Sequence, residues 1–195
     1  MRGGAAGNRS IVQGSSPIVL AHEVFHWWTH ARLVKPEAKW FSEGFTNYYG
    51  IKAATRAGLI TKGKAEECFA DLSAEMRFLE KDGVQSLRLS SRRYAKESRS
   101  QRLVYSKGTL LALSLEREIM EMGGSMDTVL KRILSARRTG LSNEDLQTFF
   151  EKELGKALAK RLGEFLTTPK PLPDLGLPPA NGNSGCARFL PKRLQ

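Results

Sequence analysis

Apolar residues recur every three or four positions along most of this chain, the spacing that predicts amphipathic α-helices. The first predicted helix begins at Ser16-Pro17, a serine cap followed by proline at the first helical position. It runs to about Val34, because the residue before Pro36 is excluded from the helical region. Its apolar positions predict that this helix is buried in the core: Ile18, Ala21, Val24, Phe25 and Trp28.

The same criteria predict further helices over about residues 37–57, 62–81, 103–122, 126–138 and 143–166. The stretch from Ser142 to Asp145 resembles a capping box, which marks the start of the last of these helices. Residues 84–101 lack helical spacing and predict a short extended piece and a Ser/Arg-rich loop beside the functional cleft. The fold class is therefore predicted to be mainly α.

Composition divides the chain into three parts. Residues 1–15 are rich in Gly and Ser, and residues 167–195 are rich in Pro and Gly and are expected to form a flexible tail. Residues 16–166 are long enough to form one helical domain with a sizeable core.

The candidate chemistry lies in the first helix, where all three histidines of the chain fall within nine residues. His22 and His26 are one helical turn apart on the same face, so both rings can approach one metal ion. Glu23 lies about 60° round the helix from His26. Two neutral nitrogen ligands with an adjacent carboxylate base are what a zinc hydrolase requires, and Glu43 is a candidate third ligand.

Other interpretations of this pattern stay open. A histidine pair on an amphipathic helix is often only a packed or surface pair, and two histidines with one carboxylate also bind non-haem iron. Glu23 between the histidines favours zinc, because a hydrolase needs a general base there. His30 lies about 12 Å beyond His22 and cannot share the same ion, so it is interpreted as a histidine at the surface or beside a ligand.

The motifs resemble those of the gluzincin aminopeptidases. These motifs are His22-Glu23-x-x-His26-x-Trp28, then Trp40-Phe41-x-Glu43-Gly44-Phe45-Thr46-x-Tyr48-Tyr49, and later Tyr105-Ser106-Lys107-Gly108. The sequence is most similar to the glycyl aminopeptidase family, with the alanyl aminopeptidase family as a relative. The resemblance implies that His22, His26 and Glu43 bind Zn²⁺, that Glu23 is the general base, and that Tyr105 stabilises the oxyanion. Without this resemblance, Tyr105 would be predicted to be a packing residue of a buried helix.

The resemblance also implies a fold, namely the helical catalytic half of a gluzincin (thermolysin-like) metallopeptidase without the usual upstream β domain. Only sixteen residues separate His26 from Glu43, a shorter spacing than in either family. The stretch from Gly3 to Asn8 resembles the glycine-rich substrate strand but lacks its glutamate. The sequence therefore leaves exopeptidase and endopeptidase action open.

Two structural expectations accompany the proposed site. Gly44 is expected to let the second helix approach the first, so that Glu43 reaches the metal. Asn47 lies one turn after Glu43 and is expected to hydrogen-bond a ligand imidazole.

A net charge of +11 predicts non-specific attraction to anionic surfaces. The basic residues are scattered, however, without the interleaved aromatic residues of a single-strand binder, which disfavours nucleic acid as a partner. The expected partner is a peptide or protein substrate. The alternative interpretations are a truncated zinc-binding domain without activity and a basic interaction module; the oligomeric state is undetermined.

Cys68 and Cys186 are far apart in sequence and lack metal-ligand spacing, so free thiols are predicted for both. The sequence contains no run of 18 uncharged apolar residues, so no membrane span is predicted. The start of the chain lacks the apolar run of a signal peptide, which favours the cytoplasm.

Overall fold

The computed structural model describes residues 16–29, 33–136, 139–180 and 186. Within these residues the secondary structure is helical, apart from an isolated bridge between Val34 and Leu141. The α-helices are α1 (Pro17–Thr29), α2 (Thr46–Arg56), α3 (Lys62–Leu79), α4 (Leu87–Arg93), α5 (Ser98–Glu121), α6 (Met126–Ser135), α7 (Asn143–Leu154) and α8 (Lys156–Thr167). A short 3₁₀ turn, η1 (Pro36–Ala38), and a π-helical turn, η2 (Trp40–Phe45), precede α2. The mainly α prediction is confirmed.

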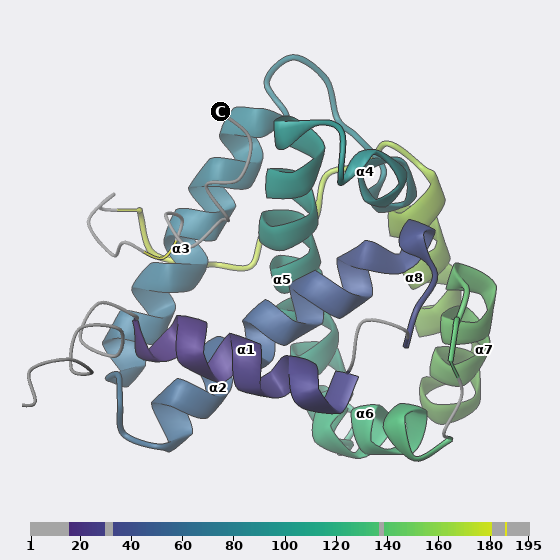
Figure 1. The fold of residues 1–195 in the computed structure, drawn as a ribbon, viewed down its shortest axis with the longest axis horizontal. Coiled ribbons are helices and arrows are strands. Elements are labelled where there is room, and N and C mark those ends of the chain that lie inside the picture. Colours follow the sequence, from purple (N-terminus) through teal and green to yellow (C-terminus); the bar gives the residue numbers. More distant parts are fainter. Residues whose placement is uncertain (1–15, 30–32, 137–138, 181–185, 187–195) are drawn as a thin grey trace, which may run out of the picture.

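Helix α5 is the central element of the fold (Figure 1). It contacts α3, α4, α2, α6 and η2, and α1 packs along α2 (Figure 1). A helix that is apolar around most of its circumference must be covered on several sides. This explains why the residues from Leu103 to Leu115 are all buried.

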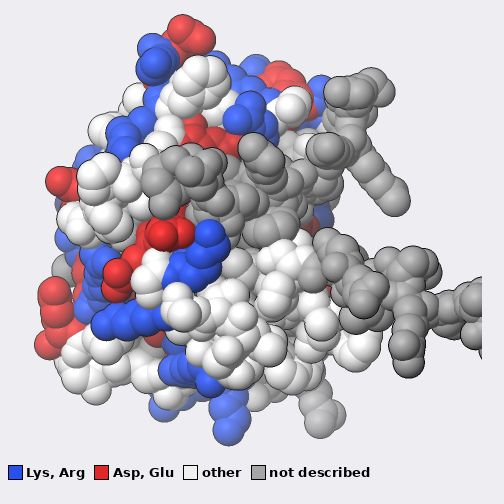
Figure 2. Space-filling view, turned by 90° about the vertical axis from the view of Figure 1, so that its left-hand side faces the viewer, with Lys and Arg blue, Asp and Glu red and all other residues white. Residues whose placement is uncertain are grey.

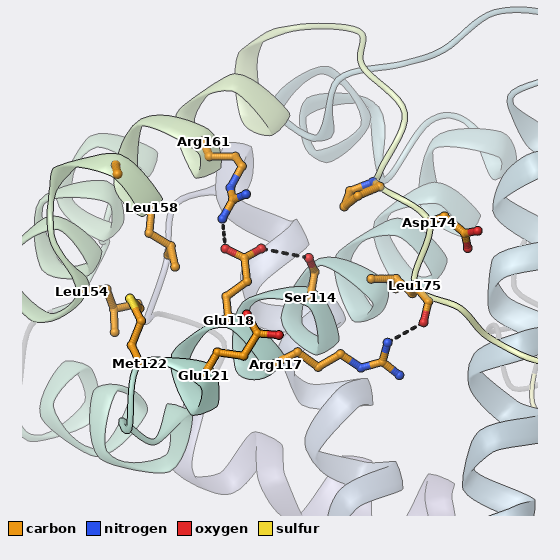
Figure 3. Close-up of a pocket in the computed structure, with 12 residues that line it drawn as sticks. Ser114, Arg117, Glu118, Glu121, Met122, Leu154, Leu158, Arg161, Asp174 and Leu175 are labelled. Carbon is orange, nitrogen blue, oxygen red and sulfur yellow. Dashed lines mark hydrogen bonds and ion pairs between the residues drawn. The ribbon is translucent and has the colours of Figure 1, made fainter.

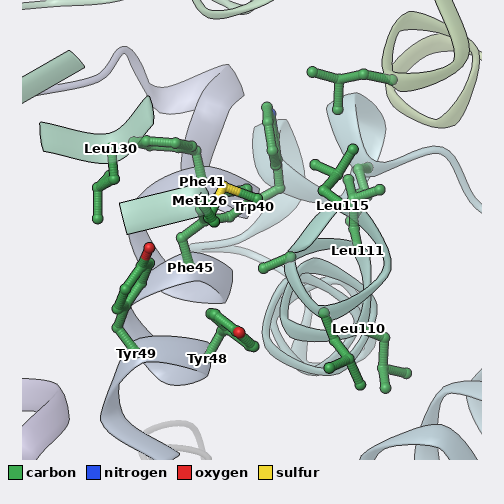
Figure 4. Packing of buried hydrophobic residues seen from close by; sticks show 14 of the residues in the cluster. Trp40, Phe41, Phe45, Tyr48, Tyr49, Leu110, Leu111, Leu115, Met126 and Leu130 are labelled. Atoms are coloured by element: carbon green, nitrogen blue, oxygen red, sulfur yellow. The ribbon is translucent and has the colours of Figure 1, made fainter. Parts of the chain in front are cut away.

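Aromatic side chains fill the contact between η2 and α5. Trp40, Phe41 and Phe45 are each at most 1% exposed and pack with Leu111 and Leu115 (Figure 4). The ring centroids of these aromatic residues are 4.7–5.7 Å apart. Each buried ring contributes about 2–3 kcal/mol of hydrophobic stabilisation, so this segment is held firmly against α5.

Two hydrogen bonds fix the start of the same segment. The indole Nε1 of Trp40 donates to Asn143 Oδ1 at 2.7 Å, and its backbone N–H donates to Ser91 Oγ at 3.0 Å. Both contacts join η2 to helices distant in sequence. The backbone of η2 is therefore anchored at one end by α4 and α7.

Several predicted boundaries are wrong. The first helix was predicted to reach about Val34, but Val34 takes part in the bridge with Leu141; the described helix α1 spans Pro17–Thr29. Trp28 was predicted to be buried, but it is 66% exposed, because only one face of α1 packs against α2. Helix α5 begins at Ser98 instead of about Leu103.

The predicted extended piece at residues 84–101 is also wrong. Ser86 caps α4 by accepting the Leu89 backbone N–H at 3.3 Å, and Leu87 is fully buried. Alternation over three residues is too short to distinguish a strand from a capped helical turn. The described residues offer no neighbouring strand with which this segment could pair.

The last helical region follows the capping-box prediction. Ser142 and Asp145 exchange both hydrogen bonds of the box. The region is split into α7 and α8 at Gly155, whose φ of 86° lies in the left-handed range that glycine tolerates. After α8, residues 168–180 have no regular structure, but Leu172 is 8% exposed and joins the core.

The prediction of two free thiols is wrong. Cys68 of α3 and Cys186 form a disulfide across a sequence separation of 118 residues. Cys186 therefore lies against α3, and both cysteines are buried. Separation along the sequence does not exclude proximity in the fold, which the cysteine count alone cannot reveal. In the described part of the chain, no helix is both long and apolar enough to cross a membrane.

Candidate metal centre

Helix α1 presents both histidines on one face, as its sequence spacing predicts. Its start is fixed by Ser16, whose hydroxyl accepts the Ile18 backbone N–H at 3.3 Å. The rings of His22 and His26 lie edge to face with centroids 4.6 Å apart. His22 is buried and His26 is half-buried, so the pair lies at the edge of the core.

Glu43 reaches this pair from the π-helical turn. Its Oε2 lies 3.8 Å from His22 Nε2 and 3.3 Å from His26 Nε2. Single turns of π-helix are rare and frequently occur at functional sites. The wider turn is a local feature of η2 that α-helical spacing in the sequence does not predict.

The three side chains form a candidate metal-binding group whose donor atoms are those that zinc prefers. One ligand atom from each of His22, His26 and Glu43 lies within 4.8 Å of the other two. In a tetrahedral zinc site with bonds of about 2.0–2.1 Å, neighbouring ligand atoms are about 3.4 Å apart. The two imidazole–carboxylate distances therefore fit this geometry with small adjustments, and three protein ligands leave a fourth position open.

Glu43 is ionised in this environment. Burial alone would raise the pKa of its carboxyl, but the adjacent imidazoles of His22 and His26 and the charge of Lys39 outweigh this effect, so the pKa lies well below its ordinary value. Lys39 Nζ lies 3.3 Å from Glu43 Oε1, the oxygen directed away from the imidazoles. The carboxylate thus carries the charge that a cation requires.

Tyr105 also contacts the centre. Its hydroxyl donates to Glu43 Oε2 at 3.0 Å, and its ring centroid is 5.9 Å from that of His22. Burial, with the charge of Glu43 adding to it, raises the pKa of the Tyr105 phenol, which keeps its proton. Because the phenol is neutral, it can donate a hydrogen bond beside the candidate metal ligands.

Glu23 lies next to His22 on α1 and is exposed. It is not one of the three residues whose ligand atoms converge, and its role as the general base stays a prediction. Two other sequence features, His30 and the stretch from Gly3 to Asn8, lie outside the described residues.

Two predicted contacts of the site are wrong. Asn47 donates to Thr109 Oγ1 at 3.0 Å, which ties α2 to α5 instead of orienting an imidazole. Gly44 faces α5 and not α1. The glycine that admits α1 is Gly50, where an added Cβ would lie 3.1 Å from the Ile18 carbonyl oxygen and 3.2 Å from the His22 nitrogen.

Two residues near the centre were missed by the sequence analysis. Lys39 stands four positions before Glu43, a spacing that favours ion pairs on helices and that offered a signal. Tyr94 follows α4, and its hydroxyl donates to that of Tyr105 at 3.1 Å. No sequence spacing connects Tyr94 with the other residues of the site.

A separate cavity of about 540 Å³ lies between α5, α8 and the segment after α8 (Figure 3). Arg161 pairs with Glu118, and Arg117 donates to the Leu175 carbonyl (Figure 3). None of the residues of the metal centre lines it. The Arg161–Glu118 pair joins α8 to α5, and Arg117 holds the segment after α8 against α5. The cavity is distinct from the metal centre.

Comparison with known proteins supports the fold. No model of a known protein family matches the sequence, and no curated protein matches it. Among solved structures, the chain is similar to an M1 zinc metallopeptidase from Deinococcus radiodurans, an E323A mutant crystallised with a Tyr-Ser-Ala substrate. The TM-score is 0.61 at 19% sequence identity, over 80% of this chain and 34% of that one. The chain therefore has the fold of the helical part of that enzyme and spans about a third of its length.

Proposed function

We propose that this chain is a zinc-dependent peptidase that resembles the aminopeptidases. The observation that carries the proposal is the convergence of His22, His26 and Glu43 within 4.8 Å, with the Tyr105 hydroxyl on the same carboxylate. The structural similarity to a metallopeptidase crystallised with a tripeptide supports a peptide as the substrate class.

The residues divide the chemistry between them. When bound to the two histidines and Glu43, zinc supplies a Lewis acid that polarises the scissile carbonyl and acidifies water. Glu23 accepts the proton of the attacking water and delivers it to the leaving amine. Tyr105 donates its hydroxyl hydrogen to the oxyanion, a contribution of about 3 kcal/mol in comparable sites.

The test separates binding of zinc from hydrolysis. Glu23→Gln is expected to keep zinc but to lose hydrolysis of fluorogenic substrates, because an amide cannot accept the proton. Substrates with a free α-amine and N-blocked internal peptides, each assayed with and without chelator, distinguish exopeptidase from endopeptidase action. A Glu23→Gln variant that still cleaves would remove Glu23 from the mechanism.

The same assay tests the first alternative. A wild-type chain that binds zinc but cleaves no peptide would be a zinc-binding domain without activity.

The surface charge bears on the second alternative, the basic interaction module. On the face shown in Figure 2, Lys and Arg are interspersed with Asp and Glu, so this face offers no extended surface of one sign. Polyanion binding that is steeply salt-dependent and insensitive to chelator would favour that module instead.

A further inference from the structure

The Tyr94 hydroxyl is connected to the metal centre by a chain of two hydrogen bonds. It lies 3.1 Å from the Tyr105 hydroxyl, which lies 3.0 Å from Glu43 Oε2. That oxygen is the one nearest to both imidazoles. Tyr94 thus stands two hydrogen bonds from the candidate metal ligands.

The direction of both bonds is fixed by chemistry. A carboxylate that binds a metal is deprotonated and can only accept hydrogen bonds. Tyr105 therefore gives its single hydroxyl hydrogen to Glu43. Its oxygen is then free only to accept, and Tyr94 must be the donor of the second bond.

Lys39 closes the arrangement into a ring. Its ammonium lies 3.3 Å from Glu43 Oε1 and 5.5 Å from the centroid of the Tyr94 ring, a distance at which a cation is attracted to an aromatic face. Tyr94 is consequently held at both ends, by Lys39 over its ring and by Tyr105 at its hydroxyl. Lys39 immediately precedes η2, Glu43 lies in η2, Tyr105 lies in α5 and Tyr94 follows α4, so the ring joins three elements.

The consequence concerns Tyr105. To donate to a substrate oxygen, the Tyr105 hydroxyl must turn its hydrogen away from Glu43 while its oxygen stays in place. The hydrogen bond from Tyr94 fixes that oxygen in either state, and a phenol that accepts a hydrogen bond becomes a stronger donor.

We propose that Tyr94 is a positioning residue that holds the Tyr105 hydroxyl against the metal ligand Glu43 and acts on the centre only through Tyr105. The inference rests on the proposed function in that it takes Glu43 as a zinc ligand. It adds a residue that lies outside the motifs of the sequence and predicts energetic coupling between two tyrosines.

The test is a double-mutant cycle on zinc affinity, measured in the full chain by competition with a chromophoric chelator. Tyr105→Phe is expected to weaken zinc binding about tenfold and Tyr94→Phe about threefold, the scale of changes in residues that orient ligands. The double variant is expected to match Tyr105→Phe alone. Tyr49→Phe is the matched control, since it removes a tyrosine hydroxyl bond to Asp127 away from the centre, and it should leave zinc affinity unchanged.

Additive effects, about thirtyfold in the double variant, would overturn the proposal, as would wild-type zinc affinity in Tyr94→Phe. In hydrolysis, Tyr94→Phe is expected to lower kcat about tenfold with KM unchanged, an effect absent in a Tyr105→Phe background. Coupled zinc affinities without any hydrolysis by the wild type would support the positioning role and refute the peptidase function. Absence of zinc binding in the wild type would overturn both.

Discussion

Gly44 and Gly108 bring the backbones of η2 and α5 into direct contact. A Cβ added at Gly44 would lie 2.6 Å from both the Cα and the carbonyl carbon of Gly108. A Cβ at Gly108 would in turn lie 2.8 Å from the Trp40 carbonyl oxygen. Each glycine follows a residue of the candidate site within three positions, Glu43 in one element and Tyr105 in the other. The close approach is what brings the phenol within hydrogen-bond distance of the carboxylate.

Gly44→Ala is therefore expected to destabilise the fold by about 2–3 kcal/mol, because the obstructing atoms are backbone and cannot rotate away. It should also weaken zinc binding by moving Glu43. Urea unfolding and chelator competition measure the two effects. The matched control is Gly63→Ala in α3, where an added Cβ meets nothing within 4 Å. Gly63→Ala should stabilise by up to about 1 kcal/mol, and equal effects of the two variants would contradict the packing argument.

Lys107 is a buried structural cation. It is fully buried, and its Nζ donates to Glu80 Oε1 at 2.7 Å and to the backbone carbonyls of Gln85 and Lys170 at 3.0 and 2.8 Å. Lys107→Met is expected to cost about 3–5 kcal/mol in the free energy of unfolding, since the buried Glu80 carboxylate loses its partner. Chemical denaturation measures this cost.

An exposed ion pair supplies the control for Lys107. Lys64 pairs with Glu67 at 3.1 Å near the start of α3, and both side chains are more than a third exposed. Lys64→Met should change stability by less than about 1 kcal/mol. If Lys107→Met were equally mild, the buried ammonium would not be what anchors the segment after α8.

The Asp127 carboxyl makes the stability of the fold depend on pH. Burial opposes its ionisation, but hydrogen bonds from Lys52, Arg56 and Tyr49 outweigh it and lower the pKa of Asp127 to about 2 from 3.8. A lowered carboxyl pKa contributes stability above pH 4 that is lost as the pH falls from about 4 to about 2. Since the side chain is 38% exposed, solvent screening reduces the contribution to about 1 kcal/mol.

Asp127→Asn is accordingly expected to unfold more easily than the wild type at pH 7, by about 1 kcal/mol, and the difference should shrink as the pH falls toward 2. Urea titrations at a series of pH values follow this convergence. A constant difference down to pH 2 would show that the carboxylate charge is not responsible.

The parts predicted from the sequence are those governed by local spacing. His22 and His26 share a face because a helix repeats every 3.6 residues, and the caps at Ser16 and Ser142 follow from short-range hydrogen bonds. Among the long-range contacts, that of Tyr105 was accessible only through the resemblance to a family, whereas Glu43 was a candidate ligand before the resemblance was named.

The errors arise where packing between segments that are distant in sequence determines the local conformation and the contacts. The π-helical turn around Glu43 and the contact of Tyr94 with Tyr105 depend on how η2, α4 and α5 pack. The partner of Gly44 was misassigned because sequence shows that a glycine is present but not which backbone approaches it. The disulfide of Cys68 was missed for the same reason, since its partner lies 118 residues further along the chain.

The central claim is that His22, His26 and Glu43 together bind one zinc ion, and metal content tests it most directly. Elemental analysis of the purified chain, dialysed against zinc and then against metal-free buffer, is predicted to give about one zinc per chain. The His26→Ala variant, treated in the same way, should retain little. Zinc absent from the wild type, or retained equally by His26→Ala, would contradict the account.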